Sequence, residues 1–160
     1  MSAPRSICLL RLSAIGDTCN AAAVVNAIRQ YYPEAEITWV IGKAEAALMA
    51  GMDGVNFVVF DKKQGLAAYR NLWRQLQGKR FDVLLLMQVA LRANLASLCI
   101  SAKRRIGYDK AKSKELHSLF INERIEPTDK VHVLDNFRQF QKTLGIPLEA
   151  PDWNIPVNAE

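Results

Sequence analysis

The residues best placed for chemistry lie in a short turn near the N-terminus, Leu12–Thr18, with the sequence LSAIGDT. An apolar run precedes this turn and a segment with helical spacing follows it. Asp17 is therefore expected at a helix N-terminus, where free N–H groups and the helix dipole favour anions. Gly16 permits a close approach of the backbone to a ligand. Two interpretations remain open: Asp17 is a functional carboxylate, or Asp17 or Thr18 only caps the helix.

The same turn excludes two common nucleotide sites. It lacks the Gly-x-Gly-x-x-Gly spacing of dinucleotide-binding folds and the glycine and lysine pattern of a P-loop. A histidine-based metal site is also disfavoured, because the chain has only two histidines, His117 and His132. The three cysteines lack the spacing of a zinc or redox site, and we interpret all three as buried small hydrophobic residues: Cys8, Cys19 and Cys99. We expect no metal and no cofactor.

Positive charge is concentrated in one segment. Residues Lys103–Lys114 carry six basic groups against one acid, Asp109, which gives +5, and the whole chain also carries +5. The remaining chain is therefore neutral. One basic segment on a neutral body favours a local anionic partner, such as phosphate groups on a substrate, over nucleic acid. The alternative is a solvated charged loop without a ligand.

These residues need a framework that brings them together, and the hydropathy pattern predicts one. Apolar runs at residues 7–12, 37–41, 55–60 and 81–87, with a short run at 105–108, are typical of strands covered on both faces. Helical spacing occurs at residues 21–32, 43–50, 69–76, 91–98 and 133–144, and the last of these helices is expected to stop at Gly145. The alternation predicts an α/β fold with a parallel sheet and helices on both faces. Ligands of such sheets bind beyond the carboxyl ends of the strands.

Length and composition predict a single domain. The chain has 160 residues, half of them apolar. We expect one domain over 1–146 and a linker over 147–160, where Pro147, Pro151 and Pro156 occur without helical spacing. No apolar stretch reaches the length of a membrane span and no signal-peptide cleavage site is evident, so the expected compartment is the cytoplasm.

Several segments resemble one known family. The opening turn Arg11–Asp17 (RLSAIGD) after an apolar strand resembles that of the bacterial ADP-heptose:lipopolysaccharide heptosyltransferases, glycosyltransferase family 9. Further segments look like landmarks of the N-terminal half of that family: Tyr32–Val40 (YPEAEITWV), Lys79–Val83 with Gln88 and Arg92, Arg105–Asp109 (RIGYD), and His132. Met87 departs from the pattern, because the family typically has aspartate there.

The resemblance implies a GT-B enzyme, in which two Rossmann-like domains face a cleft. The N-terminal domain would hold the lipopolysaccharide core acceptor, an acidic glycolipid, and the C-terminal domain would hold ADP-heptose. This chain resembles the first domain only, one half of a GT-B architecture, with 147–160 leading toward a donor-binding domain absent from it. We therefore expect the chain alone to be inactive. The implied location is cytoplasmic, with peripheral contact at the inner face of the inner membrane.

The resemblance also implies roles for residues. Asp17 would be the general base of an inverting transfer, which needs no second, nucleophilic carboxylate. The residues expected to bind the acceptor are Ser13, Gly16, Thr18, Lys62, Lys63, Gln88, Arg92, Arg105, Lys112 and Lys114. Local capping remains the alternative for Ser13 and Thr18, and a polar helix start for Gln88 and Arg92. His132 receives no role.

Three other functions compete with this one. The first is a non-catalytic α/β domain that binds a phosphoglycan or a nucleotide without turning it over. A response-regulator-like or flavodoxin-like domain is disfavoured, because the chain has neither an acidic pair after its first strand nor a flavin phosphate loop. Nucleic-acid binding would rest on the basic segment alone, which has no interleaved aromatic residues.

Overall fold

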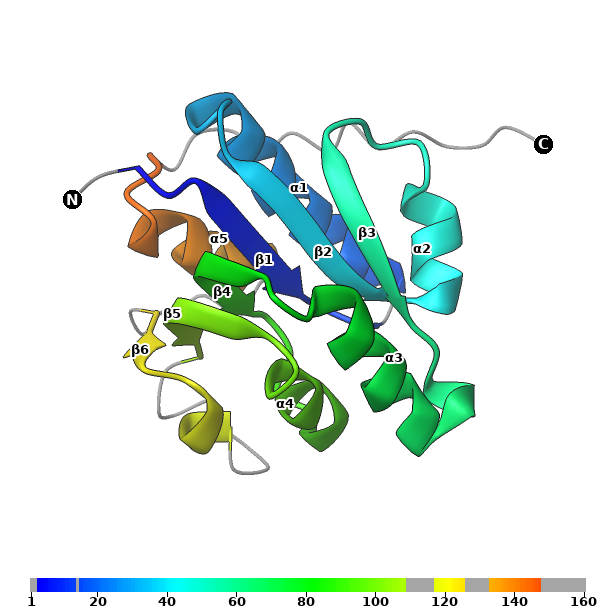
Figure 1. Cartoon of the computed structure of the whole chain (residues 1–160). Helices are drawn as coiled ribbons and strands as arrows, with labels where there is room; N and C mark the ends of the chain where they lie inside the picture. Colours follow the sequence, from blue (N-terminus) through cyan, green and yellow to red (C-terminus); the bar gives the residue numbers. More distant parts are fainter. Residues whose placement is uncertain (1–2, 14, 109–116, 126–132, 148–160) are drawn as a thin grey trace.

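The computed structural model describes residues 3–13, 15–108, 117–125 and 133–147. Within these ranges, six strands form one sheet in the order β3-β2-β1-β4-β5-β6, and all neighbouring strands pair in parallel (Figure 1). The strands are β1 (Ser6–Leu10), β2 (Glu36–Gly42), β3 (Val55–Phe60), β4 (Arg80–Leu86), β5 (Ser101–Gly107) and β6 (Glu123–Arg124). The chain order reverses between β1 and β4, so the ends of these two strands form the switch point at which such sheets bind ligands.

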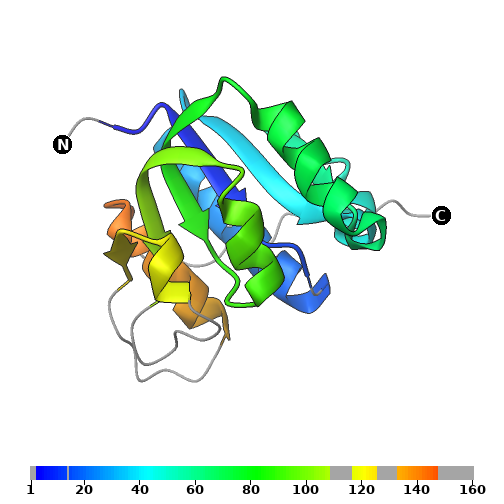
Figure 2. The same ribbon diagram turned by 60° about the horizontal axis from the view of Figure 1, so that its bottom comes forward.

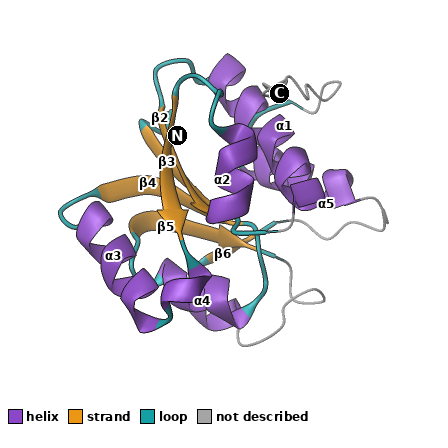
Figure 3. Ribbon diagram, turned by 90° about the vertical axis from the view of Figure 1, so that its right-hand side faces the viewer, coloured by secondary structure: helices purple, strands orange, loops and turns teal. Residues whose placement is uncertain are grey.

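Helices cover both faces of the sheet, as expected (Figure 2). One layer contains α1 (Ile15–Tyr31), α2 (Lys43–Met49) and α5 (Val133–Thr143). The opposite layer contains α3 (Leu66–Leu76) and α4 (Leu91–Ser97), as Figure 3 shows. Two 3-10 helices complete the described elements, η1 (Lys62–Gln64) and η3 (His117–Phe120). No helix in the described part of the chain is long and apolar enough to cross a membrane.

The core lies on both faces of the two central strands. Ile7, Leu9 and Leu85 face the layer of α1 and α5, whereas Leu10 and Leu84 face α3 and α4. All five side chains are fully buried. Burial of an aliphatic side chain of this size stabilises a fold by about 1.5–3 kcal/mol. Because both faces are buried, these strands show apolar runs rather than an alternating pattern.

The structure refines several expectations. The helix after the first turn begins at Ile15, inside the turn, and β5 begins four residues before the predicted strand at 105–108. The strand β6 was not predicted at all. Gly145, with φ of 82°, ends α5 as expected, and its N–H donates to Lys142 O at 2.9 Å. Cys8 is fully buried, whereas Cys19 and Cys99 are only partly buried, so our interpretation of the cysteines holds fully for Cys8 alone.

Candidate functional site

The turn after β1 lies across the carboxyl ends of three strands. Beyond Leu10 the backbone continues the strand pairing, with Arg11 N–H donating to Val40 O at 3.2 Å and Met87 N–H donating to Leu10 O at 3.1 Å. Gly42 N–H then donates to Leu12 O at 3.0 Å. These bonds fix the ends of β1, β2 and β4 beside one another, which is the edge where a parallel sheet binds ligands.

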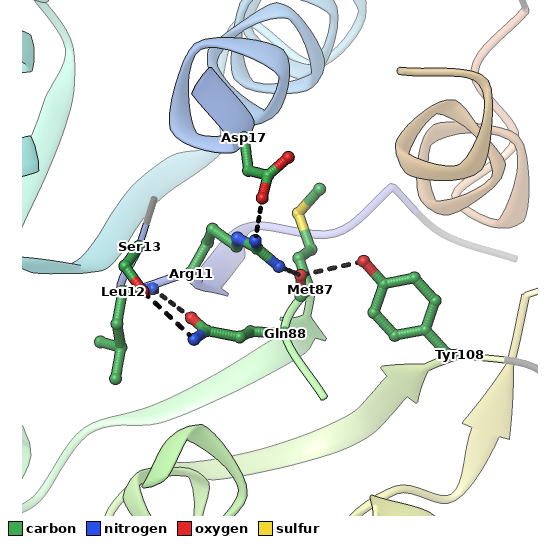
Figure 4. A network of polar contacts seen from close by, with 7 residues as sticks. All are labelled: Arg11, Leu12, Ser13, Asp17, Met87, Gln88 and Tyr108. Atoms are coloured by element: carbon green, nitrogen blue, oxygen red, sulfur yellow. Dashed lines mark hydrogen bonds and ion pairs between the residues drawn. The ribbon is translucent and has the colours of Figure 1, made fainter. Parts of the chain in front are cut away.

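Asp17 is held by Arg11, a residue to which the sequence analysis gave no role. Arg11 Nη2 lies 2.6 Å from Asp17 Oδ2, and Arg11 Nη1 donates to Met87 O at 2.8 Å (Figure 4). The Arg11 guanidinium also lies over the ring of Phe137. The Asp17 side chain keeps 36% of its surface exposed, and its Oδ1 accepts no hydrogen bond from a described residue. The carboxylate is therefore oriented, accessible and free at one oxygen.

The carbonyl group of Met87 is shared by two donors. Besides Arg11, the hydroxyl group of Tyr108 donates to Met87 O at 3.0 Å (Figure 4). Tyr108 follows β5, is buried, and packs edge-to-face against Phe140 of α5. The side chain of Met87 is fully buried in the core. Position 87 therefore contributes a main-chain acceptor to the site and an apolar side chain to the core.

Gln88 joins the turn to the end of β4. Its Oε1 accepts from Leu12 N–H at 2.7 Å, and its Nε2 lies 3.5 Å from Ser13 Oγ (Figure 4). The amide group can make both contacts because it carries an acceptor and a donor on adjacent atoms. Gln88 therefore sets the position of Ser13 at the mouth of the sheet.

A pocket of about 470 Å³ opens beside this turn. It includes five of the predicted acceptor-binding residues: Ser13, Lys62, Lys63, Gln88 and Arg92. Three charged residues that were not predicted also line it: Lys43, Glu45 and Asp61. Lys43, Lys62, Lys63 and Arg92 are exposed and form no ion pair within the described ranges. The pocket therefore offers four cationic groups to an anionic ligand.

Other predicted residues lie elsewhere. Asp17, Gly16 and Thr18 do not line the pocket. Gly16 is exposed, and a Cβ built on it would meet nothing within 4 Å. Thr18 is fully buried, in both its side chain and its backbone. Lys112, Lys114 and His132 lie outside the described residues.

The expected role of Arg105 in acceptor binding does not fit its contacts in the structure. Its guanidinium donates to three main-chain carbonyl groups, those of Ile100 at 2.6 Å, Ser97 at 2.8 Å and Phe120 at 2.8 Å. Burial lowers the pKa of this guanidinium. The group is committed to joining α4, β5 and η3, so it is not available to an acceptor anion in this arrangement.

His117 occupies a buried polar contact that the sequence analysis did not anticipate. Tyr108 N–H donates to its Nε2 at 3.0 Å, and its Nδ1 lies 2.9 Å from Asn94 Oδ1. With Nε2 acting as acceptor, Nδ1 carries the proton and the ring is neutral. Burial, and secondarily the charge of Arg124, lowers the pKa of His117 to about 4. His117 does not line the pocket, and its contacts join η3 to α4 and to the end of β5.

Two signals in the sequence could have located the missed residues. Lys43 and Glu45 directly follow the end of β2, and Asp61 directly follows β3, so the rule that identified Lys62 and Lys63 applies to them as well. Arg11 was part of the family motif, but its contact with Met87 spans 76 residues of sequence and has no local signature.

Comparison with known proteins gives consistent results. A family model described as glycosyltransferase family 9 (heptosyltransferase) matches residues 69–160. The lipopolysaccharide core heptosyltransferase OpsX of Haemophilus influenzae is 44% identical over 158 residues, which are 99% of this chain and 46% of that relative. The chain thus spans about half the length of the curated relative it matches.

Solved structures agree on the fold. E. coli heptosyltransferase WaaC with ADP superposes with a TM-score of 0.79 at 20% identity, over 92% of this chain and 51% of that one. A glycosyl transferase family 9 protein from Veillonella parvula gives a TM-score of 0.76 at 19% identity, over 89% of this chain and 42% of that one. These likenesses confirm the predicted fold class, with the chain covering about half of each structure.

Proposed function

The chain belongs to glycosyltransferase family 9, the heptosyltransferases, and from this we propose that it is the acceptor-binding half of an enzyme that transfers heptose from ADP-heptose to the lipopolysaccharide inner core. The observation that carries the proposal is the pairing of an oriented carboxylate, Asp17, with a pocket lined by four unpaired cationic groups at the same sheet edge. The H. influenzae relative is a lipopolysaccharide core heptosyltransferase, and a solved E. coli relative holds an ADP-heptose analogue.

The proposed reaction is a direct displacement with inversion. Asp17 Oδ1 takes the proton from an acceptor sugar hydroxyl group while that oxygen forms a bond to the anomeric carbon of heptose. The bond from the anomeric carbon to the diphosphate oxygen breaks at the same time, and ADP leaves with the electron pair. Arg11 keeps Oδ2 occupied, so the proton is directed to the other oxygen. One carboxylate is sufficient, because no covalent intermediate forms.

The acceptor is an acidic glycolipid in this proposal. Lys62, Lys63 and Arg92 attract its anionic groups, and Ser13 and Gln88, which line the same pocket, offer hydrogen bonds. Lys112 and Lys114 belong to the proposed acceptor site as well. Residues 1–146 form the acceptor domain, and 147–160 lead toward a domain that binds ADP-heptose. The chain alone would then bind acceptor without transferring heptose.

The proposal includes peripheral contact with the cytoplasmic face of the inner membrane, where a lipid-anchored acceptor is accessible. Support comes from α4 and its C-terminal end, where Leu91, Leu95 and Leu98 are 45%, 39% and 67% exposed. Their spacing of four and three residues places them on one helix face. The same helix contributes Arg92 to the pocket, so the pocket lies next to the proposed contact surface.

The binding step can be tested on the chain itself. Isothermal titration with a delipidated core oligosaccharide should give a measurable Kd, and ADP-heptose should bind more weakly. Tighter binding of ADP-heptose than of the oligosaccharide would contradict the assignment of this half to the acceptor. Binding without any involvement of Asp17 in transfer would instead favour a non-catalytic phosphoglycan-binding domain.

The catalytic step is tested by Asp17→Asn in the enzyme that joins this half to a donor-binding half. Loss of a general base should lower kcat by about 10²–10⁴, while the Kd of the acceptor changes only a few-fold because the pocket is intact. Asp53→Asn, at an exposed acid in the turn before β3, is the matched control and should leave kcat unchanged. A kcat for Asp17→Asn within a few-fold of the parent enzyme would refute the assignment.

A further inference from the structure

The pocket is lined by a mostly buried glutamate for whose carboxylate the described part of the chain provides no hydrogen-bond donor. Glu45, the third residue of α2, lines the pocket and is only 9% exposed. It forms neither a hydrogen bond nor an ion pair with any residue in the described ranges. Buried carboxylates normally have partners, because a charge removed from water without one is costly. The oxygens of Glu45 are not sealed from the solvent, so a donor group that enters the pocket can pair with them.

The position of Glu45 is fixed by a close approach to the backbone. A Cβ built on Gly42 would lie 2.7 Å from Glu45 Oε2 and would also overlap Leu12 O. Gly42 N–H donates to that same Leu12 oxygen at 3.0 Å. The carboxylate is thus packed against the ends of β1 and β2, and it lines the same pocket as Ser13 and Gln88. Only glycine at position 42 leaves room for it there.

The charges around the pocket limit what this partner can be. A carboxylate accepts hydrogen bonds and donates none, so its partner must be a hydroxyl group, an ammonium group or another donor. A phosphate or carboxylate group on the ligand would be repelled from Glu45 and attracted to Lys43, Lys62, Lys63 and Arg92. The pocket therefore offers one ligand two kinds of contact, an acceptor for hydroxyl groups at Glu45 and cations for anionic groups.

We propose that Glu45 is a specificity-determining residue that accepts hydrogen bonds from hydroxyl groups of the acceptor sugar. This inference rests on the proposed function, since it names the part of the acceptor that Glu45 recognises. A sugar with two neighbouring hydroxyl groups satisfies both carboxylate oxygens at once, as a planar acceptor pair allows. A ligand that carries only phosphate leaves Glu45 unsatisfied.

The test compares two probes on Glu45→Gln, a change that keeps the side-chain size and removes the charge. Charge-assisted hydrogen bonds to a buried group are strong, so the Kd of delipidated core oligosaccharide should rise about 10–100-fold. The Kd of inorganic pyrophosphate should fall several-fold, because a repelling charge has been removed. Opposite changes for the two probes are not expected from a residue with a purely structural role. Glu36→Gln, at the exposed start of β2, is the matched control and should change neither Kd.

Each outcome of this experiment is decisive. If wild-type chain binds the oligosaccharide and Glu45→Gln binds it equally well, the inference is overturned while the proposed function stands. If wild-type chain does not bind the oligosaccharide, both fail. If Glu45→Gln weakens both probes together with a lower Tm, Glu45 is structural and the inference is overturned. Glu45→Asp provides a second variant: it should keep the pyrophosphate affinity of the wild type and lose part of the oligosaccharide affinity.

Discussion

Two side chains, Arg11 and Gln88, hold the turn between β1 and α1 from different directions. Arg11 binds the carboxylate of Asp17 and the carbonyl group of Met87, and Gln88 binds the backbone of Leu12. Arg11 and Met87 lie 76 positions apart in the sequence, as do Leu12 and Gln88, so no local spacing marks these contacts. Only Arg11 and Asp17 are close in sequence, six positions apart. The sequence could therefore locate the turn and its acid, but not the groups that orient them.

Gly16 provides a prediction at this scale. It lies in the first turn of α1, its φ is not in the left-handed region, and a Cβ built on it would meet nothing within 4 Å. Gly16→Ala should therefore raise the free energy of unfolding by about 0.5–1 kcal/mol in urea denaturation, because alanine reduces the freedom of the unfolded chain. If the acceptor approaches the backbone here, the same variant should bind core oligosaccharide more weakly.

Gly65→Ala is the matched comparison for this variant. Gly65 also has open space around it, but its φ is +58°. The alanine variant there should lower the free energy of unfolding, by about 1 kcal/mol or more, because an L side chain is strained in that conformation. A Gly16→Ala variant that is destabilised as much as Gly65→Ala would show that the start of α1 is not as the structure has it.

At the scale of elements, the pattern of apolar residues predicted most of the sheet. The strand at 55–60 was predicted to the residue, and every long helix was found, with α1 starting six residues earlier than expected and α3 and α5 lying within three residues of their expected bounds. These elements carry a local signal, because their burial imposes a period on the sequence. The short elements β6 and η3 carry none. They are held by distant contacts, such as those of Asn122 with the backbone of β5.

The residues of the candidate site also fall into those that the sequence predicted and those that it did not. Residues that directly follow strand ends, such as Lys62 and Gln88, were predicted because topology alone brings strand ends together. Arg105 was expected in a strand and lies in β5, but a charged strand residue does not reveal which layer it faces, so the contacts of its guanidinium group with main-chain carbonyl groups could not be predicted. Its neighbour Arg104 points to the opposite layer and pairs with Glu123 at 2.7 Å. The alternation of a strand therefore divides two adjacent arginines between two structural roles.

The contact of His117 with Asn94 and Tyr108 predicts a pH dependence for the packing of η3 against α4 and β5. In the unfolded chain histidine titrates near pH 6.5, whereas the pKa of His117 in the folded chain is lowered to about 4. Between these values the unfolded state binds more protons, so the free energy of unfolding falls as the pH is lowered from about 6.5 to about 4. The expected loss is about 1–3 kcal/mol.

Urea denaturation at pH 7 and at pH 4.5 measures this loss, and His117→Gln isolates the contribution of His117 from that of other titrating groups. The glutamine variant should be less stable than wild type at pH 7 and should lose less stability on acidification. If both proteins lose the same amount between the two pH values, His117 does not titrate as its surroundings require.

At the scale of the whole molecule, the stretch of chain that contains α3 and α4 is strongly basic. Between Lys62 and Tyr108 the sequence contains ten basic residues and one acid, Asp82. Trp73 of α3 is 51% exposed, and it shares a hollow of about 340 Å³ with Lys79 and Leu98. Exposed apolar side chains surrounded by basic side chains are suited to binding an anionic lipid surface.

Vesicle co-sedimentation tests this face. The chain should bind vesicles that contain anionic lipid, bind purely zwitterionic vesicles weakly, and dissociate as salt is raised. The double variant Leu95→Gln with Leu98→Gln should lower binding about 10-fold or more, because two leucine side chains no longer enter the lipid. Tyr31→Ser, at an exposed residue of α1 in the other layer, is the control. Equal binding of the double variant and the control would refute this face, and a double variant that instead shifts a dimer equilibrium would assign it to a second copy.

The shared carbonyl group of Met87 has a consequence for the whole sheet. Tyr108, Met87, Arg11 and Asp17 form a continuous series of contacts that starts beyond β5, passes the end of β4 and the turn after β1, and reaches α1. Such a series holds the Asp17 carboxylate in one orientation before any ligand arrives. A substitution at Tyr108 is therefore expected to change the alignment of the Asp17 carboxylate, although the two residues do not touch.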